Sequence, residues 1–296
     1  MLWLIAVLIG SACYAFANVI DNYFSNKIFR DIPSLVFYAS LFNILFIPLF
    51  FFKEIPSLPT IVELPYLIIL GITGVAYLFP YYKALQHDDT SVVVSLFSLG
   101  KIFVPLLAFF LVNERLSVFQ YLGFIIIIIS SALLTWNGSK KIRFNMSFYY
   151  MLVVAFLIAI EGVIYKHLFT SISWATGLVW SLVFTFIFSL FLFLVPQHRR
   201  NIISQLHHFK NNFHYFLIEE LATFGGTAFK TLAISTASIT LVEGVISFIP
   251  FFVLIYALLF STLLPNLFKE KITARDLIKK GLLFILMIIG VVLSVQ

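Results

Sequence analysis

Long runs of apolar residues constrain this chain more than any other feature of its sequence. A run of about 20 apolar residues matches the roughly 30 Å hydrocarbon core of a bilayer at 1.5 Å rise per residue. Lipid offers the backbone no hydrogen-bond partners, so such runs cross a membrane as helices. Charged residues make up only 11% of the 296 residues, less than half the share of about 25% that is usual in soluble domains. The sequence therefore predicts an all-α integral membrane protein.

Ten such runs are present, which predicts ten transmembrane helices. They cover residues 1–20, 33–52, 65–86, 91–112, 117–136, 147–168, 172–195, 213–233, 239–264 and 275–295. The segments between them are short, and none is long enough to form a soluble domain. The longest, residues 196–212, is expected to be a solvated loop facing the lipid headgroups.

The second half of the chain echoes the first. A charge inside an apolar run, followed by a polar corner, occurs twice: Lys101 precedes the corner 113–117, and Glu243 precedes the corner 269–273. The ten runs divide into five and five. An odd number of helices in each half gives the halves opposite orientations, as in the inverted repeats of many transporters.

We therefore predict two inverted five-helix repeats. The first occupies residues 1–140 and the second residues 141–296, with the polar stretch 136–143 as the linker between them. Most of the 19 basic residues fall in the odd-numbered loops. The positive-inside rule then places those loops in the cytoplasm and both termini outside it.

The corner 113–117 also resembles a family motif. Its sequence Asn-Glu-Arg-Leu-Ser, with Pro105 before it and Gly123 after it, is similar to the end of the fourth helix in the EamA-like branch of the drug/metabolite transporter superfamily. The second-half corner looks like the same motif. The resemblance implies a secondary transporter with a central cavity, an exporter or exchanger of a small polar or amphipathic metabolite that works by alternating access. The expected location is a bacterial cytoplasmic (inner) membrane.

Other functions are weighed against this one. A flippase for a lipid-linked sugar or headgroup is the alternative, with Lys101 meeting phosphate. An enzyme is not expected, because no catalytic pair such as His-x-x-x-His occurs within a span, and no cofactor or metal motif appears. The net charge of +6 fits loop residues near membrane surfaces rather than nucleic acid. Expected partners are the lipid bilayer and a small-molecule substrate, with proton coupling left open, and the chain is expected to be a monomer or homodimer.

Polar residues inside the apolar runs are the candidates for substrate binding. A cation at the centre of a span costs about 2.5–3.5 kcal/mol on insertion scales, so Lys101 needs a cavity or a partner. Lys101 could attract a substrate carboxylate or phosphate, while Glu161 or Glu243 holds an amine or a proton. A buried structural ion pair is the alternative role. The predicted substrate-binding set adds one amide and three aromatic residues, namely Asn18, Tyr14, Tyr82 and Trp180.

Charges nearer the ends of the runs are predicted to be structural. Asp21, Lys83 and Lys230 are close enough to a helix end to reach the headgroups by snorkelling. Glu219 and Glu220 are neighbours on a helix and point about 100° apart, so we expect only one of them to face inward.

Overall fold

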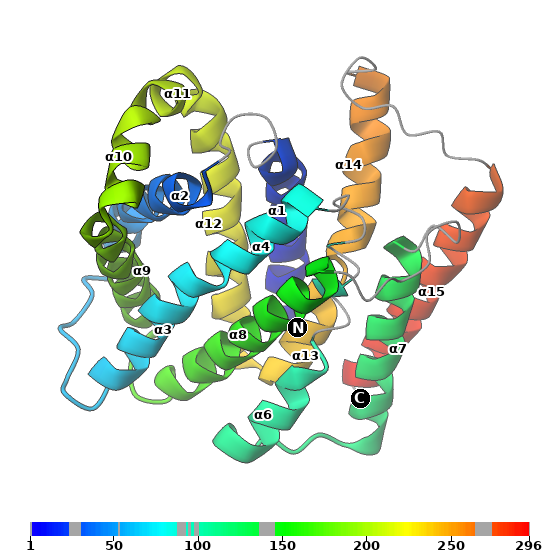
Figure 1. Cartoon of the computed structure of the whole chain (residues 1–296). Helices are drawn as coiled ribbons and strands as arrows, with labels where there is room; N and C mark the ends of the chain where they lie inside the picture. Colours follow the sequence, from blue (N-terminus) through cyan, green and yellow to red (C-terminus); the bar gives the residue numbers. More distant parts are fainter. Residues whose placement is uncertain are drawn as a thin grey trace.

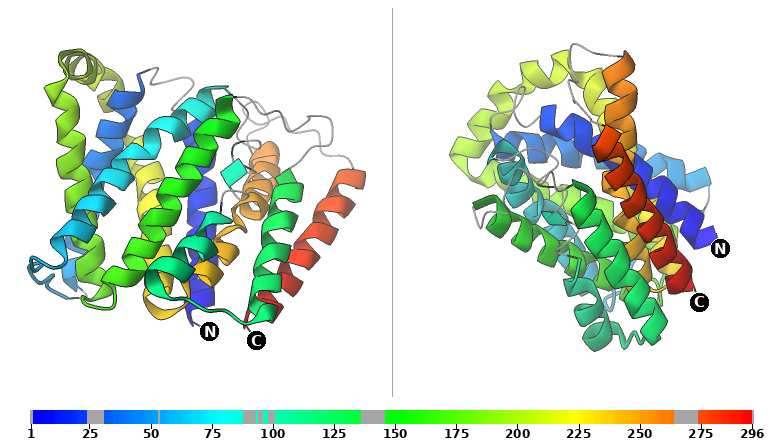
Figure 2. Two further views of the ribbon diagram at one scale, coloured as in Figure 1. Left: turned by 60° about the horizontal axis from the view of Figure 1, so that its bottom comes forward. Right: turned by 90° about the vertical axis from the view of Figure 1, so that its right-hand side faces the viewer.

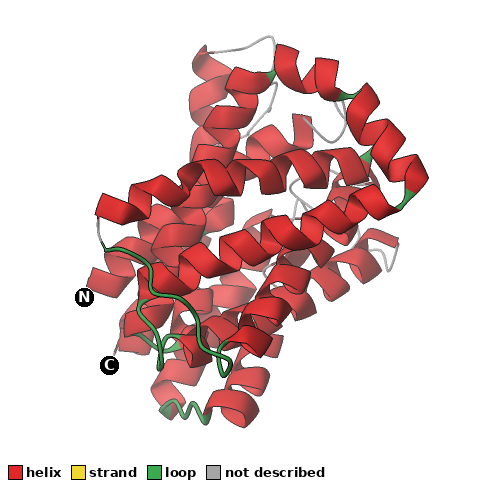
Figure 3. Cartoon of the chain, turned by 90° about the vertical axis from the view of Figure 1, so that its left-hand side faces the viewer, coloured by secondary structure: helices red, strands yellow, loops and turns green. Residues whose placement is uncertain are grey.

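The computed structural model describes residues 2–23, 31–52, 54–87, 93, 96–97, 101–135, 146–263 and 274–295. Every regular element within these ranges is helical (Figure 3), which confirms the all-α prediction. Among the described residues, six helical stretches are long and apolar enough to cross a membrane: Leu2–Asp21, Ile32–Phe52, Leu64–His87, Met146–Leu168, Trp174–Leu194 and Ile239–Tyr256. The structure therefore supports a multi-pass membrane protein, while the count of ten spans stays a prediction.

In the first part of the chain, the described residues include six α-helices of ten residues or more and one 3-10 helix. They are α1 (Leu2–Tyr23), α2 (Ile32–Phe46), η2 (Ile47–Phe52), α3 (Leu64–Ala76), α4 (Leu78–His87), α6 (Phe103–Val112) and α7 (Val118–Thr135), labelled in Figure 1. Local sequence sets their ends. At the start of α7, the Ser117 hydroxyl accepts from the Gln120 amide N–H, while the Gln120 side chain accepts from the Ser117 N–H. This reciprocal pair is a capping box.

In the second part, the ranges that the structure describes form eight α-helices and one 3-10 helix. They are α8 (Met146–Leu168), α9 (Trp174–Leu190), η3 (Phe191–Leu194), α10 (Pro196–Ser204), α11 (Leu206–Asn211), α12 (Phe213–Thr236), α13 (Ile239–Ile246), α14 (Ile249–Leu263) and α15 (Ala274–Val295). Helices α10 and α11 correct the expectation of a solvated loop at 196–212. Their buried residues Ile202 and Phe209 pack near Tyr38, whose hydroxyl donates to the Ile202 carbonyl at 2.6 Å.

Prolines break two of the predicted helices. Pro80 has no N–H to donate to the Ala76 carbonyl, and the chain divides there into α3 and α4. Pro250 likewise leaves the Ile246 carbonyl without a helical donor, and α13 ends at that residue. Lys101, expected in the middle of a span, instead lies in a turn just before α6. The breaks place irregular backbone inside the bundle, where proteins tolerate it only beside other protein or a cavity.

Close helix contacts join distant parts of the sequence. Helix α1 packs against α12, and α7 packs against α15, as Figures 1 and 2 show. Glycine permits the second contact: a Cβ on Gly123 would lie 2.4 Å from the Gly290 carbonyl oxygen, and a Cβ on Gly290 would lie 2.8 Å from the Gly123 carbonyl oxygen. Small residues at such crossings let two backbones approach within a membrane.

The corner 113–117, which carries the family resemblance, caps α13, a helix of the second half of the chain. Asn113 ends α6 in the left-handed conformation at φ 54°, which asparagine tolerates better than most residues. The next residue, Glu114, accepts hydrogen bonds from the N–H groups of Ile239 and Thr240 at 2.9 and 3.1 Å. Its carboxylate therefore satisfies the first turn of α13. The corresponding corner 269–273 and the linker 136–143 lie outside the described residues.

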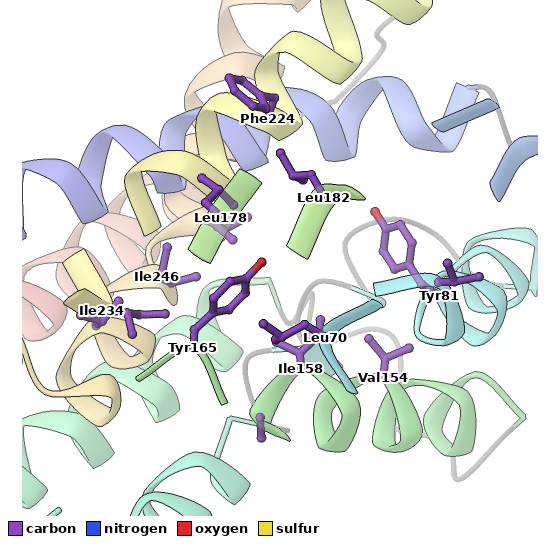
Figure 4. Packing of buried hydrophobic residues seen from close by; sticks show 14 of the residues in the cluster. Leu70, Tyr81, Val154, Ile158, Tyr165, Leu178, Leu182, Phe224, Ile234 and Ile246 are labelled. Atoms are coloured by element: carbon purple, nitrogen blue, oxygen red, sulfur yellow. The ribbon is translucent and has the colours of Figure 1, made fainter. Parts of the chain in front are cut away.

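The buried apolar side chains form one cluster that runs through the bundle. Figure 4 shows part of it, including Leu70, Ile158 and Tyr165. Tyr81 and Ile158 belong both to this cluster and to the wall of a cavity. The apolar core and the polar cavity are therefore continuous, and the same helices position both.

Candidate functional site

A cavity of about 140 Å³ lies inside the bundle. Its lining comes from α1, α2, α3, α4, α8, α12, α13 and α14, together with residues 93, 97 and 101. Ionisable side chains are unusually frequent in it for an apolar bundle: Asp21, Lys101, Glu161, Glu219, Glu220, Lys230 and Glu243. Intramembrane charges are expensive, and such residues mark sites of function.

Two lysines share one carboxylate at one end of this cavity. The Lys230 ammonium lies 2.5 Å from Glu243 Oε1, and the Lys101 ammonium lies 3.3 Å from Glu243 Oε2. Lys101 also donates to the Glu243 carbonyl oxygen at 3.2 Å. We call these three residues the Glu243 triad. It ties the turn before α6 to α12 and α13, and it holds three buried charges against one another.

Helix α8 lies close to α13 beside the triad. A Cβ on Gly162 would lie 3.0 Å from the Ile239 side chain and 3.7 Å from Glu243 Oε1, so a larger residue would require the Ile239 side chain to shift. The neighbouring residue Glu161 lines the cavity. Within the described part of the chain, its carboxylate makes no hydrogen bond and no ion pair at 4.0 Å or less. Glu161 is thus a free acid beside a satisfied triad.

A second group of acids lies on the same cavity and has no lysine partner among the described residues. Asp21 accepts from Tyr81 at 3.1 Å and from Tyr82 at 3.3 Å. Tyr81 is also within 3.0 Å of the Asn18 side-chain oxygen. These donors are neutral hydroxyl groups, so they satisfy hydrogen-bonding capacity without offsetting the charge of the carboxylate. Asp21 is buried, which corrects the expectation that it snorkels to the headgroups.

Glu219 and Glu220 complete this acidic group. Both are buried and both line the cavity, so the expectation that only one faces inward is wrong. The reason is that the buried face of α12 is wide enough to hold two side chains about 100° apart, because the helix packs against α1, α2, α8, α9 and α13, while Leu217, Ile218 and Leu221 form its exposed face. Glu219 accepts from Thr223 at 2.8 Å. We call Asp21, Glu219 and Glu220 the acidic end of the cavity.

Lys230 also departs from its predicted position at a helix end. Helix α12 continues to Thr236, so Lys230 lies more than one turn inside it, where it is buried and paired with Glu243. One feature of the sequence could have identified it. Glu219, Thr223, Thr227 and Lys230 recur at three- and four-residue intervals, which places them on one face of a helix. All four line the cavity.

The cavity brings together six of the seven predicted site residues. Lys101, Glu161, Glu243, Asn18, Tyr14 and Tyr82 all line it. Tyr14 meets Thr227 through a hydroxyl–hydroxyl contact of 2.9 Å. Trp180 does not line the cavity, because its indole N–H is directed to the Ser57 carbonyl oxygen at 2.8 Å. Their role in binding a substrate stays a prediction. In the part of the chain that the structure describes, no group of three or more His, Cys, Asp or Glu side chains is arranged to hold a metal ion.

An apolar helical bundle around a charge-lined cavity is the architecture of a membrane protein that handles a polar solute. Residues 1–136 match the EamA-like transporter family, which confirms the resemblance to the drug/metabolite transporter superfamily. This match implies a membrane transporter.

A solved crystal structure, described only as that of a protein, has a similar fold. It is 16% identical to this chain, with a TM-score of 0.65 over 98% of each chain. At that identity the likeness concerns the fold alone. No curated protein matches the chain.

Proposed function

We propose that this protein is a secondary transporter that moves a small polar or amphipathic metabolite by alternating access. One observation carries the proposal: a cavity of about 140 Å³ with seven ionisable side chains, buried in a bundle of apolar helices. Burying so many charges is unfavourable unless they are paired or serve a ligand. The comparisons give no support to the flippase alternative.

The contacts between helices support the proposed two inverted repeats. Two repeats would pair the helices of the first half with those of the second in chain order: α1 with α8, α2 with α9, α3–α4 with α12, α6 with α13–α14, and α7 with α15. If each helix is replaced by its counterpart, a pair of helices that pack should give another pair that packs. Under this exchange, the contact between α1 and α12 corresponds to the contacts of α8 with α3 and α4. The contacts of α1 with α13 and α14 correspond to the contact between α8 and α6. All of these helix pairs pack together. The pairs α2–α9 and α7–α15 exchange into themselves. This is the pattern expected of ten helices in two repeats.

Polar ties at one end of the bundle support a carrier that is closed on that side. Glu114 links the corner after α6 to the start of α13. Lys166 donates to the carbonyl oxygens of Ile234 at 3.0 Å and Ala237 at 2.7 Å. The corner after α6 lies at the end of the molecule where both termini are found (Figure 2). In an alternating-access cycle these ties would separate when the cavity opens toward that side.

Transport can be tested directly with reconstituted protein. A thermal-shift screen of the purified chain against metabolites identifies compounds that bind, because a ligand stabilises by RT ln(1 + [L]/Kd). Each compound that binds is then tested for counterflow in proteoliposomes. The proposal predicts that a bound compound accumulates in preloaded vesicles and not in protein-free vesicles. Compounds that bind without moving across the membrane would overturn the transporter assignment.

A further inference from the structure

The charges around the cavity do not balance. Five carboxylates against two ammonium groups leave a formal charge of −3. Both ammonium groups are held by Glu243, so neither is placed to neutralise the acidic end. Only neutral hydroxyl groups donate to Asp21 and Glu219 within the described residues. A buried ionised carboxylate without a cationic partner is strongly unfavourable.

Glu220 shows most clearly that a cationic partner is missing from the described residues. It is 4% exposed and lines the cavity. Its side chain is hydrogen-bonded to another acid, Glu219, and no ammonium group among the described residues pairs with it. The charge of the third acid, Asp21, repels it. Glu161 is another carboxylate on the same cavity, with neither an ion pair nor a hydrogen bond in the described ranges.

We propose that the substrate of this carrier is a small organic cation whose amine group binds at the acidic end of the cavity, against Asp21, Glu219 and Glu220. An alkylammonium supplies both the positive charge and the N–H donors that these carboxylates lack. The apolar cavity wall, including Ile158 and Ile246, would contact its hydrocarbon part. The Glu243 triad then serves as a neutralised boundary rather than as the binding site of a substrate anion. This inference rests on the proposed transport function and names its substrate class.

Three probes of equal chain length separate charge from size and shape. Butane-1,4-diamine, butane-1,4-diol and butanedioate carry cationic, neutral and anionic ends on the same four-carbon chain. Full-length protein in detergent is titrated with each probe, and the thermal unfolding midpoint gives an apparent Kd. We expect the diamine to raise the midpoint in a saturable manner, with no comparable shift from the diol or the butanedioate.

Two matched variants locate the binding site. Glu220→Gln keeps the shape of the side chain and removes its charge, and we expect it to weaken diamine binding about tenfold or more. Glu54→Gln removes one negative charge from a residue that contacts Ser173 and Thr176 and does not line the cavity, so it should leave the Kd unchanged. Size-exclusion profiles of both variants establish that they remain folded.

Three other outcomes would overturn the cation assignment. Stabilisation by butanedioate, lost in Lys230→Met, would show that an anion binds at the triad, and the transporter proposal would stand. An equal Kd for the diamine in Glu220→Gln and the unaltered chain would place its binding elsewhere. If no probe binds, the carboxylates at the acidic end hold protons only. A diamine that binds as expected but shows no counterflow in proteoliposomes would leave the site intact and refute transport.

Discussion

The Glu243 triad and the acidic end both place buried carboxylates beside the same cavity, but they differ in whether the protein supplies a cation to pair with them. In the triad, one carboxylate meets two ammonium groups, so every charge has an opposite charge within 3.3 Å in the protein itself. At the acidic end, three carboxylates meet hydroxyl groups and one another. The difference separates a structural charge from a functional one: the first has its partner in the fold, and the second has a place for a partner from outside.

The largest effect is expected from Glu243→Gln. The substitution keeps the size of the side chain and strands two buried ammonium groups, a situation that destabilises proteins by about 3–5 kcal/mol. The thermal unfolding midpoint in detergent should fall strongly, and expression should fall with it. Glu161→Gln is the control, because Glu161 has no ion pair within the described residues. An unchanged midpoint for Glu243→Gln would show that the triad is not a structural element.

The two lysines of the triad should differ in importance. Lys230 lies closer to Glu243 than Lys101 does, at 2.5 Å against 3.3 Å. After either lysine is replaced, the other still holds the carboxylate, so each loss should fall within the range for hydrogen bonds to charged groups. We expect about 3 kcal/mol for Lys230→Met and about 1.5 kcal/mol for Lys101→Met. Chemical unfolding of both variants side by side measures the order, and the reverse order would contradict the geometry.

Sequence reasoning identified the class of fold and part of the site for clear physical reasons. Hydrophobic run length predicts spanning helices because the bilayer fixes their length. A lysine as deep as Lys101 must have a partner, and the structure supplies Glu243. The distance of Asp21 and Lys230 from a helix end does not predict their burial, because burial depends on which neighbouring helices cover that end. Such tertiary contacts, like the Gly123–Gly290 crossing, leave no local pattern in the sequence.

Removal of the hydroxyl groups around Asp21 should have a modest effect on stability. Tyr81 reaches both Asp21 and Asn18, whereas Tyr82 reaches Asp21 at the longer distance of 3.3 Å. We expect Tyr81→Phe to cost about 1 kcal/mol and Tyr82→Phe less than that. The unfolding midpoints of the two variants test this order. A loss as large as that of Glu243→Gln would mean that the hydroxyl groups fully stabilise the acidic end, which would remove its need for a ligand.

Glu220→Gln should have the smallest effect on stability and the opposite sign to Glu243→Gln. The two substitutions are chemically identical and both act on buried carboxylates. At Glu243 the lost charge was paired, whereas at Glu220 its charged neighbours are acids, so its removal relieves repulsion. Without ligand, we expect no loss of unfolding free energy and a gain of about 1 kcal/mol at most. A clear loss would reveal that Glu220 already has a cationic partner in the fold, and the distinction between the two regions of the cavity would then fail.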